Sequence, residues 1–280
     1  MKKLNGKVAA VTGAASGLGR AMALAFADEG MDVALADVDE LNLSAVADDV
    51  QEKGVRAITL KVDVSQAAQV EAFRDQIIAR LGAVHLVCNN AGVSPLGAAW
   101  ESSAADWEWI LGVNLWGVIH GVRAFTPALL AQQEGHIVNT ASVAGLISPP
   151  GMGAYNVTKH AVVALSETLY HDLSERNAKV GVSVLCPAYV PTGIADSERS
   201  RPRHLASAVE KSQETQAKEA MMRKAVKSGK ISADEVARAV VKAVKANRFY
   251  ILTHPRIKPA IRARMEDILK ERAPRNPLAL

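Results

Sequence analysis

Short β-branched runs alternate with longer segments of helical periodicity along this chain. The short runs lie at residues 8–11, 32–37, 57–62, 85–89, 136–140, 180–185 and 249–252. The predicted helices between them lie at residues 18–29, 41–53, 67–81, 103–133, 154–176 and 235–246. A repeated β–α order without a linker predicts one α/β domain, doubly wound, with helices on both faces of a mostly parallel sheet. We therefore expect a single seven-stranded domain over residues 1–280.

Two segments interrupt this order. Residues 189–230 are polar and mostly helical in pattern, and they separate the sixth strand from the last predicted helix. We expect this insertion to form a lid over a substrate pocket. Residues 255–280 form a C-terminal tail whose role the sequence does not define.

The composition is ordinary for a soluble globular protein. Of 280 residues, 49% are hydrophobic and 22% are charged, and no apolar run approaches the ~18 residues of a membrane span. Cys88 and Cys186 both lie among apolar residues, so we expect buried thiols rather than a disulfide, and a cytoplasmic location. No cluster of cysteines and histidines has ligand spacing, so no metal site is expected.

Basic residues concentrate at residues 199–230 and 256–275, and the formal net charge is +4. Such segments can bind nucleic acid, a membrane surface or an acidic substrate. Acidic residues are interleaved with the basic ones, however, and no aromatic side chains are spaced among them to stack on bases. Solvated helix faces are the favoured interpretation, and neither nucleic acid nor a membrane is expected as a partner.

A glycine-rich loop at residues 12–20 follows the first strand directly. Its glycines are spaced G-x-x-x-G-x-G rather than the better-known G-x-G-x-x-G. Glycine lets a backbone approach a pyrophosphate closely, and the N–H groups of the following helix then point at the phosphates. A tight turn without a ligand is the alternative, but the position between strand and helix favours a Rossmann-type dinucleotide site. The expected contacts are Gly13, Ser16, Gly17, Leu18 and Gly19.

Asp37 ends the second strand, 18 positions beyond Gly19. A carboxylate there can accept hydrogen bonds from both adenine-ribose hydroxyls and would repel a 2′-phosphate. Because Val38 follows, no arginine at the next position can hold such a phosphate. These residues favour NAD over NADP, although an aspartate in an ordinary turn is the alternative. Further cofactor contacts are expected from Asp63, Val64, Asn90, Ala91 and Gly92.

Tyr155 and Lys159 lie four residues apart in a predicted helix and so share one of its faces. A nearby ammonium lowers a tyrosine pKa by about 1–3 units from its usual value near 10, which would make the phenol a usable acid or base. Ser142 ends the fifth strand and could reach the same oxygen as Tyr155. Asn114 lies in the middle of a predicted helix, where asparagine is unfavourable, which suggests a functional side chain or a distorted backbone.

Taken in order along the chain, these motifs resemble the short-chain dehydrogenase/reductase family, in its compact single-domain branch. The matching segments are residues 12–19 and 89–92, followed by Asn114, Ser142, Tyr155 and Lys159. The resemblance is strong over about residues 5–195 and concerns only the layout beyond them. It implies that the last four residues form a catalytic tetrad.

The resemblance also implies hydride transfer between nicotinamide and a secondary alcohol or its ketone. Tyr155 would take the alcohol proton, or return it to the carbonyl, while Ser142 orients the same oxygen. Lys159 would lower the tyrosine pKa and bind the nicotinamide ribose. In the family, the counterpart of Asn114 holds a water that passes the proton on.

One departure from the family follows the sixth strand, where Pro187 precedes Ala188 in place of the usual glycine. An alanine restricts the backbone, so a glycine-specific geometry is not expected there. Pro187, Val190 and Thr192 are nevertheless expected to contact the cofactor, Thr192 at the nicotinamide carboxamide.

We expect a mostly apolar substrate pocket and therefore a hydrophobic secondary alcohol or ketone, with Trp100 beside the pocket. The residues expected to bind substrate are Ser94, Leu96, Ser142, Met152, Tyr155 and Tyr189. The family resemblance implies a homodimer or homotetramer formed through the helices at residues 103–133 and 154–176.

Three functions compete at this point. The favoured one is an NAD-dependent alcohol dehydrogenase. An NADPH-dependent carbonyl reductase on the same fold is the second, and Asp37 argues against it. A non-catalytic dinucleotide sensor or scaffold is the third. Such a protein would be expected to have lost part of the tetrad, which this chain keeps in full.

Overall fold

Seven parallel strands form one sheet in the order β3-β2-β1-β4-β5-β6-β7 in the computed structural model, which describes residues 1–206 and 212–279. All six neighbouring pairs are parallel, so the predicted mostly parallel sheet is confirmed. The strands are β1 Val8–Thr12, β2 Asp32–Asp37, β3 Ala57–Lys61, β4 Leu86–Asn89, β5 Gly135–Thr140, β6 Val180–Leu185 and β7 Tyr250–Ile251.

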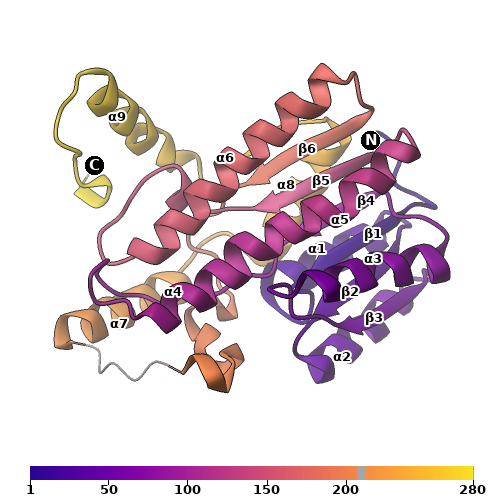
Figure 1. Ribbon diagram of the computed structural model, residues 1–280, viewed down its shortest axis with the longest axis horizontal. Coiled ribbons are helices and arrows are strands. Elements are labelled where there is room, and N and C mark those ends of the chain that lie inside the picture. The colour runs from indigo at the N-terminus through magenta and orange to yellow at the C-terminus, as the bar shows by residue number, and fades with distance from the viewer. Residues whose placement is uncertain (207–211, 280) are drawn as a thin grey trace.

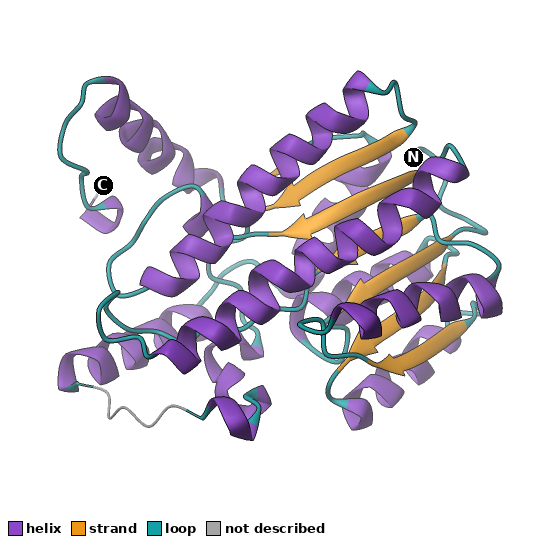
Figure 2. Ribbon diagram, in the orientation of Figure 1, coloured by secondary structure: helices purple, strands orange, loops and turns teal. Residues whose placement is uncertain are grey.

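Helices cover both faces of this sheet (Figures 1 and 2). The helices are α1 Gly17–Asp28, α2 Glu40–Gln51, α3 Ala67–Leu81, α4 Ala104–Leu111, α5 Gly117–Ala131, α6 Gly153–Glu175, α7 Gln213–Lys227, α8 Ala233–Lys245 and α9 Lys258–Leu269. The apolar sides of α1, α2 and α8 pack on one face, and those of α3, α5 and α6 pack on the other. Because both faces are covered, strands such as β1 and β5 are buried along their whole length.

The chain changes direction across the sheet between β1 and β4. The strands to one side of this point follow β1 in sequence, and those on the other side follow β4. In doubly wound sheets, the connections that leave the strand ends at such a switch point diverge and leave a crevice between them. The site is therefore expected at the carboxyl ends of β1 and β4.

The predicted long helix at residues 103–133 is continuous but distorted. It begins with a capping box between Ser103 and Asp106, and α4 and α5 are joined by a π-helical turn at Gly112–Trp116. This turn contains Asn114, so the local distortion that asparagine suggested is present. Such π-turns are rare and occur frequently at functional sites.

The insertion and the tail are both largely helical. Two short 3-10 helices, Gly193–Ser200 and Arg203–Leu205, precede α7, which lies near α4 (Figure 1). The tail after Pro255 forms α9, which extends away from the sheet at the upper left of Figure 1. A short 3-10 turn at Pro277–Ala279 follows α9.

Helix α5 approaches β4 so closely that Gly121 has no room for a side chain. An ideal Cβ on Gly121 would lie 1.9 Å from Oδ1 of Asn89. Nδ2 of Asn89 donates to Oδ1 of Asn139 at 2.9 Å, and Nδ2 of Asn139 donates to Oγ of Ser166 at 3.0 Å. A buried line of polar groups thus connects β4, β5 and α6, and it depends on the close approach at Gly121.

The Gly121→Ala variant is expected to be less stable by about 1–3 kcal/mol, because the added methyl would displace Asn89 from this buried line. The penalty should exceed the gain in helix propensity that alanine brings. Gly97→Ala is the control, since its Cβ would meet nothing closer than Oγ of Ser102 at 3.6 Å. Urea unfolding measures both variants. Equal stability of the two would contradict the tight packing at Gly121.

Candidate active site

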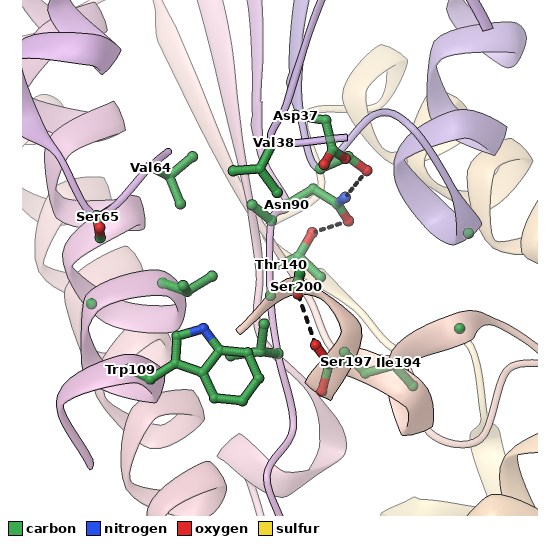
Figure 3. Close-up of a pocket in the computed structure, with 18 of the residues that line it drawn as sticks. Asp37, Val38, Val64, Ser65, Asn90, Trp109, Thr140, Ile194, Ser197 and Ser200 are labelled. Atoms are coloured by element: carbon green, nitrogen blue, oxygen red, sulfur yellow. Dashed lines mark hydrogen bonds between the residues drawn. The ribbon is translucent and has the colours of Figure 1, made fainter. Parts of the chain in front are cut away.

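A cavity of about 820 Å³ opens at the carboxyl ends of the central strands. Figure 3 shows Asp37 and Val38 at one end of it, with Trp109 facing Ile194 and Ser197 at the other. The glycine-rich loop lines the first end and the insertion lines the second. Residues from opposite ends of the sequence therefore meet in one continuous pocket.

The glycine-rich loop has a backbone that only glycine adopts easily. Gly13 has φ of 66° and Gly17 has φ of 55°, both in the left-handed region. A Cβ on Gly13 would lie 2.8 Å from Cα of Ala91, and one on Gly19 would lie 2.0 Å from the carbonyl oxygen of Gly13. Gly19 therefore lets the loop fold tightly rather than lining the cavity. Ser16 at the start of α1 makes no side-chain cap, which leaves the helix N-terminus free to receive an anion.

Asp37 is held at the rim of the cavity by the backbone around it. Its Oδ2 accepts from the N–H of Ala15 at 3.0 Å, and its Oδ1 accepts from the N–H of Asp39 at 3.1 Å. Arg20, the nearest arginine in sequence, pairs instead with Asp49 at 2.7 Å on α2. The rim thus offers a fixed carboxylate beside the glycine-rich loop, which can accept hydrogen bonds from ribose hydroxyls.

Fifteen of the sixteen residues predicted to bind the cofactor line this cavity, and Gly19 alone does not. Those lining it are Gly13, Ser16, Gly17, Leu18, Asp37, Asp63, Val64, Asn90, Ala91, Gly92, Tyr155, Lys159, Pro187, Val190 and Thr192. Together with the glycine cradle and the helix N-terminus, this lining fits a nicotinamide dinucleotide.

Asn90 ties three strand ends together below the cavity. Its N–H donates to Oγ1 of Thr12 at 2.9 Å and its Nδ2 donates to the Thr12 carbonyl at 3.0 Å. Its Oδ1 accepts from Oγ1 of Thr140 at 3.3 Å, as the dashed line in Figure 3 marks. The amide therefore fixes the ends of β1, β4 and β5 relative to one another.

Lys159 is almost completely buried, with 3% of its surface exposed. Its Nζ donates to the carbonyl of Thr140 at 3.0 Å and lies 5.6 Å from the ring centre of Tyr155. Burial disfavours the ammonium and lowers the pKa of Lys159 from 10.5 to about 8. The side chains predicted to act together are therefore adjacent.

Burial also raises the pKa of Tyr155, from 10.0 to about 12, and a hydrogen bond with Ser142 opposes this increase only in part. The sequence-based expectation of a tyrosine pKa below 10 is therefore wrong for this structure. At neutral pH Tyr155 is a phenol, because burial outweighs the hydrogen bond with Ser142.

Ser142 lies where β5 ends, in extended backbone with φ of −172°. Its Oγ accepts from the N–H of Ala144 at 3.1 Å and donates to the carbonyl of Pro187 at a long 3.4 Å. Because that second bond is weak, the hydroxyl proton can turn to another acceptor in the cavity.

Asn114 does not line the cavity but holds its wall. Its Oδ1 accepts from the N–H of Val93 at 2.8 Å, and its Nδ2 donates to the Val93 carbonyl at 2.9 Å and to Oγ1 of Thr158 at 3.3 Å. A Cβ on Gly92 would lie 3.4 Å from Oδ1 of Asn114 and 3.6 Å from Nζ of Lys159. The amide thus fixes the loop after β4 close to the lysine, and its two N–H donors are already used.

The predicted substrate residues are only partly brought together. Ser142 and Tyr155 line the cavity, whereas Ser94, Leu96, Met152 and Tyr189 are not among its lining residues. Trp100, expected beside the pocket, is 87% exposed.

Instead, the apolar wall at this end consists of Val93, Trp109, Ile194 and Leu205. Sequence reasoning missed Trp109 because it sought the pocket walls in loops. Trp109 could have been found from its position, because it lies about one and a half helical turns before Asn114 in the same predicted helix.

The alanine that replaces the usual glycine after Pro187 is accommodated without strain. Ala188 is not among the residues with positive φ, and its N–H donates to Nδ1 of His254 at 3.1 Å. His254, which sequence reasoning did not single out, therefore supports this wall of the cavity from behind.

Cys88 and Cys186 are free and buried, as expected. Over residues 1–206 and 212–279, no group of three or more histidines, cysteines or carboxylates is arranged to hold a metal ion. Among the same residues, no helix has the length and apolar character needed to cross a membrane.

The Lys159→Met variant is expected to be more stable than the wild type by about 1–3 kcal/mol at pH 7, since it removes a buried charge. The native protein binds fewer protons than the unfolded chain between about pH 8 and pH 10.5, so wild-type stability gains from this group as pH rises through that window. The difference in the free energy of unfolding between Lys159→Met and the wild type should therefore become smaller between about pH 8 and pH 10.5. Exposed Lys179→Met is the control, and urea unfolding across pH measures the difference. A less stable variant at pH 7 would contradict the lowered pKa.

The chain is similar to proteins of known class over nearly its whole length. The family model for short chain dehydrogenases matches residues 7–203. A crystal structure of a short-chain dehydrogenase/reductase from Burkholderia phymatum in complex with NAD is 52% identical, covers 100% of both chains and superposes with a TM-score of 0.98.

Two further relatives are more distant. The CLA biosynthesis dehydrogenase/reductase of Lactiplantibacillus plantarum is 34% identical over 98% of this chain and 97% of its own length. An alcohol dehydrogenase from Thermococcus sibiricus, complexed with 5-hydroxy-NADP, is 30% identical over 88% of this chain and 95% of its own, with a TM-score of 0.71. The chain belongs to the short-chain dehydrogenase/reductase family of oxidoreductases.

Proposed function

We propose that this protein is an NAD-dependent oxidoreductase that interconverts a hydrophobic secondary alcohol and its ketone. One observation carries the proposal: Ser142, Tyr155 and the buried Lys159 meet in the same cavity as the glycine-rich loop and Asp37. A hydride carrier and a proton donor could then act on one substrate carbon and its oxygen.

A bound nicotinamide would supply the hydride acceptor or donor, and this chain's residues would handle the proton. Ser142 would donate a hydrogen bond to the substrate oxygen and keep its proton, giving up the long bond to Pro187. Tyr155 would exchange a proton with the same oxygen. As a phenol with a pKa of about 12, it is ready at neutral pH to protonate the oxygen formed in ketone reduction.

Alcohol oxidation requires Tyr155 in its deprotonated form, because the phenolate must then accept the proton of the alcohol. Positive charge near the ring favours phenolate. Lys159 supplies such a charge below its pKa of about 8, and an oxidised nicotinamide would supply a second. Asn114 would act indirectly, by holding Val93 and the loop after β4 in place.

Asp37 supports NAD as the preferred cofactor, and the NAD complex of the similar Burkholderia phymatum protein is consistent with this. The Thermococcus sibiricus relative binds an NADP derivative, so an NADPH-dependent carbonyl reductase is the alternative on the same fold. The fixed carboxylate at the ribose end favours the first.

The substrate end of the cavity supports a hydrophobic substrate. Val93, Trp109, Ile194 and Leu205 present apolar surface toward Tyr155, and the flat indole of Trp109 suits a ring or a planar carbon chain. We propose that residues 193–205 act as the lid over this end.

Two further proposals concern the oligomeric state of the protein and its location in the cell. We propose a homodimer or homotetramer that uses α5 and α6, the second of which exposes Val157 and Tyr170. We further propose a cytoplasmic location, in which the two buried thiols would stay reduced.

The Tyr155→Phe variant is expected to lose about 10²–10⁴-fold in kcat/KM, because phenylalanine cannot exchange a proton with the substrate oxygen. NADH affinity, followed by fluorescence, should stay close to that of the wild type. Tyr170→Phe, on the same helix but at the surface, is the matched control and should keep full activity. Turnover of a confirmed substrate by Tyr155→Phe at the wild-type rate would refute the assignment.

The Asp37→Asn variant is expected to raise the ratio of kcat/KM for NADP to that for NAD by at least about tenfold, because the like-charge repulsion of a 2′-phosphate is removed. Exposed Asp48→Asn, on the helix that follows, is the control. Both ratios come from initial rates at 340 nm. A wild-type enzyme that already turns over equally with both cofactors would rule out the proposed preference.

A further inference from the structure

We propose that Arg201 is a positioning residue that holds residues 193–205 closed over the substrate end of the cavity and thereby sets the affinity for substrate. This inference rests on the proposed function, and it names the latch of the lid. Neither Arg201 nor its partners belong to the residues that would touch the reacting atoms.

The guanidinium of Arg201 is bound on every side although it lies on an insertion. Its Nη2 donates to Oδ1 of Asp106 at 2.7 Å, and Nε and Nη2 donate to the carboxylate of Glu198 at 2.7 and 2.9 Å. Its Nη1 donates to the carbonyl of Leu205 at 3.0 Å, and its central carbon lies 4.1 Å from the ring centre of Trp109. Only 7% of the side chain is exposed.

These partners belong to two different parts of the protein. Glu198 and Leu205 lie on the insertion, so their contacts with Arg201 make residues 198–205 into one unit. Asp106 and Trp109 lie on α4, and Asp106 is 95 positions away from Arg201 in sequence. Trp109 lines the opposite wall of the cavity. Arg201 therefore joins the lid to the wall that it covers.

Asp106 is prepared for this role within α4. Its Oδ2 accepts from Oγ of Ser103 at 2.8 Å and from the N–H of Ser103 at 2.9 Å, which leaves Oδ1 for Arg201. Burial raises its pKa, but the hydrogen bonds from Ser103 and Arg201 outweigh burial and lower the pKa on balance. The two bonds from Ser103, on the same helix turn, thus orient the carboxylate toward Arg201.

A second contact, a single hydrogen bond, joins the lid to the loop after β4. The N–H of Ser94 donates to Oγ of the buried Ser197 at 2.9 Å. Figure 3 shows Ser197 and Ile194 across the pocket from Trp109. Since one neutral hydrogen bond contributes only about 1 kcal/mol, the charged and stacked contacts of Arg201 should dominate closure.

The rest of the insertion is anchored elsewhere. Oγ1 of Thr215 on α7 donates to the carboxylate of Glu101, and Gly229 lies against the carbonyl of Tyr189. Asp196 of the lid also pairs with Arg223 on α7, but both side chains are about half exposed, so this ion pair contributes little. Loss of the Arg201 contacts should therefore release residues 193–205 without unfolding α7. The expected consequence is a lower population of the closed lid, and hence a higher KM.

Four variants separate a latch from a merely structural ion pair. Arg201→Met removes the latch but leaves Asp106 unpaired, whereas Asp106→Asn leaves Arg201 paired with Glu198. The double variant Arg201→Met/Asp106→Asn removes both charges. Arg203→Met is the control, because Arg203 is exposed on the same segment and does not line the cavity.

The measurements are KM and kcat for an alcohol substrate, NADH affinity, melting temperature, and hydrogen exchange of peptides covering residues 193–205. In Arg201→Met, KM should rise about tenfold if the closed population falls to about a tenth, with kcat changed less than about threefold. Amides of residues 193–205 should exchange faster. The double variant should recover melting temperature but keep the high KM, and Arg203→Met should match the wild type.

A lower melting temperature with unchanged KM and unchanged exchange in Arg201→Met would overturn the proposal, since it would show a structural ion pair only. Failure of the proposed function looks different: the wild type itself would then turn over no secondary alcohol. Exchange of residues 193–205, which needs no turnover, would still decide whether Arg201 holds the lid.

Discussion

The ammonium of Lys159 is buried in the middle of the protein, and the arrangement of the site depends on how it is held there. An isolated buried charge is costly, so its position must be fixed by good hydrogen bonds. The carbonyl of Thr140 accepts from it at 3.0 Å, which joins the end of β5 to α6. A Cβ on Gly145 would lie 2.5 Å from the Lys159 carbonyl, so the turn after Ser142 also packs on α6 at this residue. These two contacts bring Ser142 to Tyr155.

Different kinds of interaction form the two ends of the cavity. At the cofactor end, backbone geometry dominates: left-handed glycines, a free helix N-terminus and a carboxylate held by two N–H groups. Such a site depends on short-range backbone geometry at the strand ends. At the substrate end, the wall comes from an insertion that side chains fasten to α4. This division would let one scaffold keep its hydride chemistry while its substrate changes with the lid.

Much of this was predictable from the sequence because it depends on short-range patterns. Short β-branched runs and helical periodicity predicted the strands and helices, and strand-end positions predicted which side chains share the crevice. Asn114 signalled the π-helical turn because it fits a regular helix poorly. The insertion was predicted to cover the substrate pocket, but its packing against Trp109 was not, because Leu205 and Arg201 meet Trp109 from far along the sequence. The predicted direction of the Tyr155 pKa shift was wrong for another reason: a sequence pattern shows a neighbouring charge but not how deeply the group is buried.

The most direct test of this account is a titration of Tyr155 by NMR with ¹³C-labelled tyrosine, assigned with the Tyr155→Phe variant. In the free protein we expect a pKa near 12, because burial outweighs the hydrogen bond with Ser142. With oxidised NAD present, the added positive charge should lower that pKa by at least about one unit. A pKa below 10 in the free protein, or no response to oxidised NAD, would contradict the role assigned to the Tyr155–Lys159 pair.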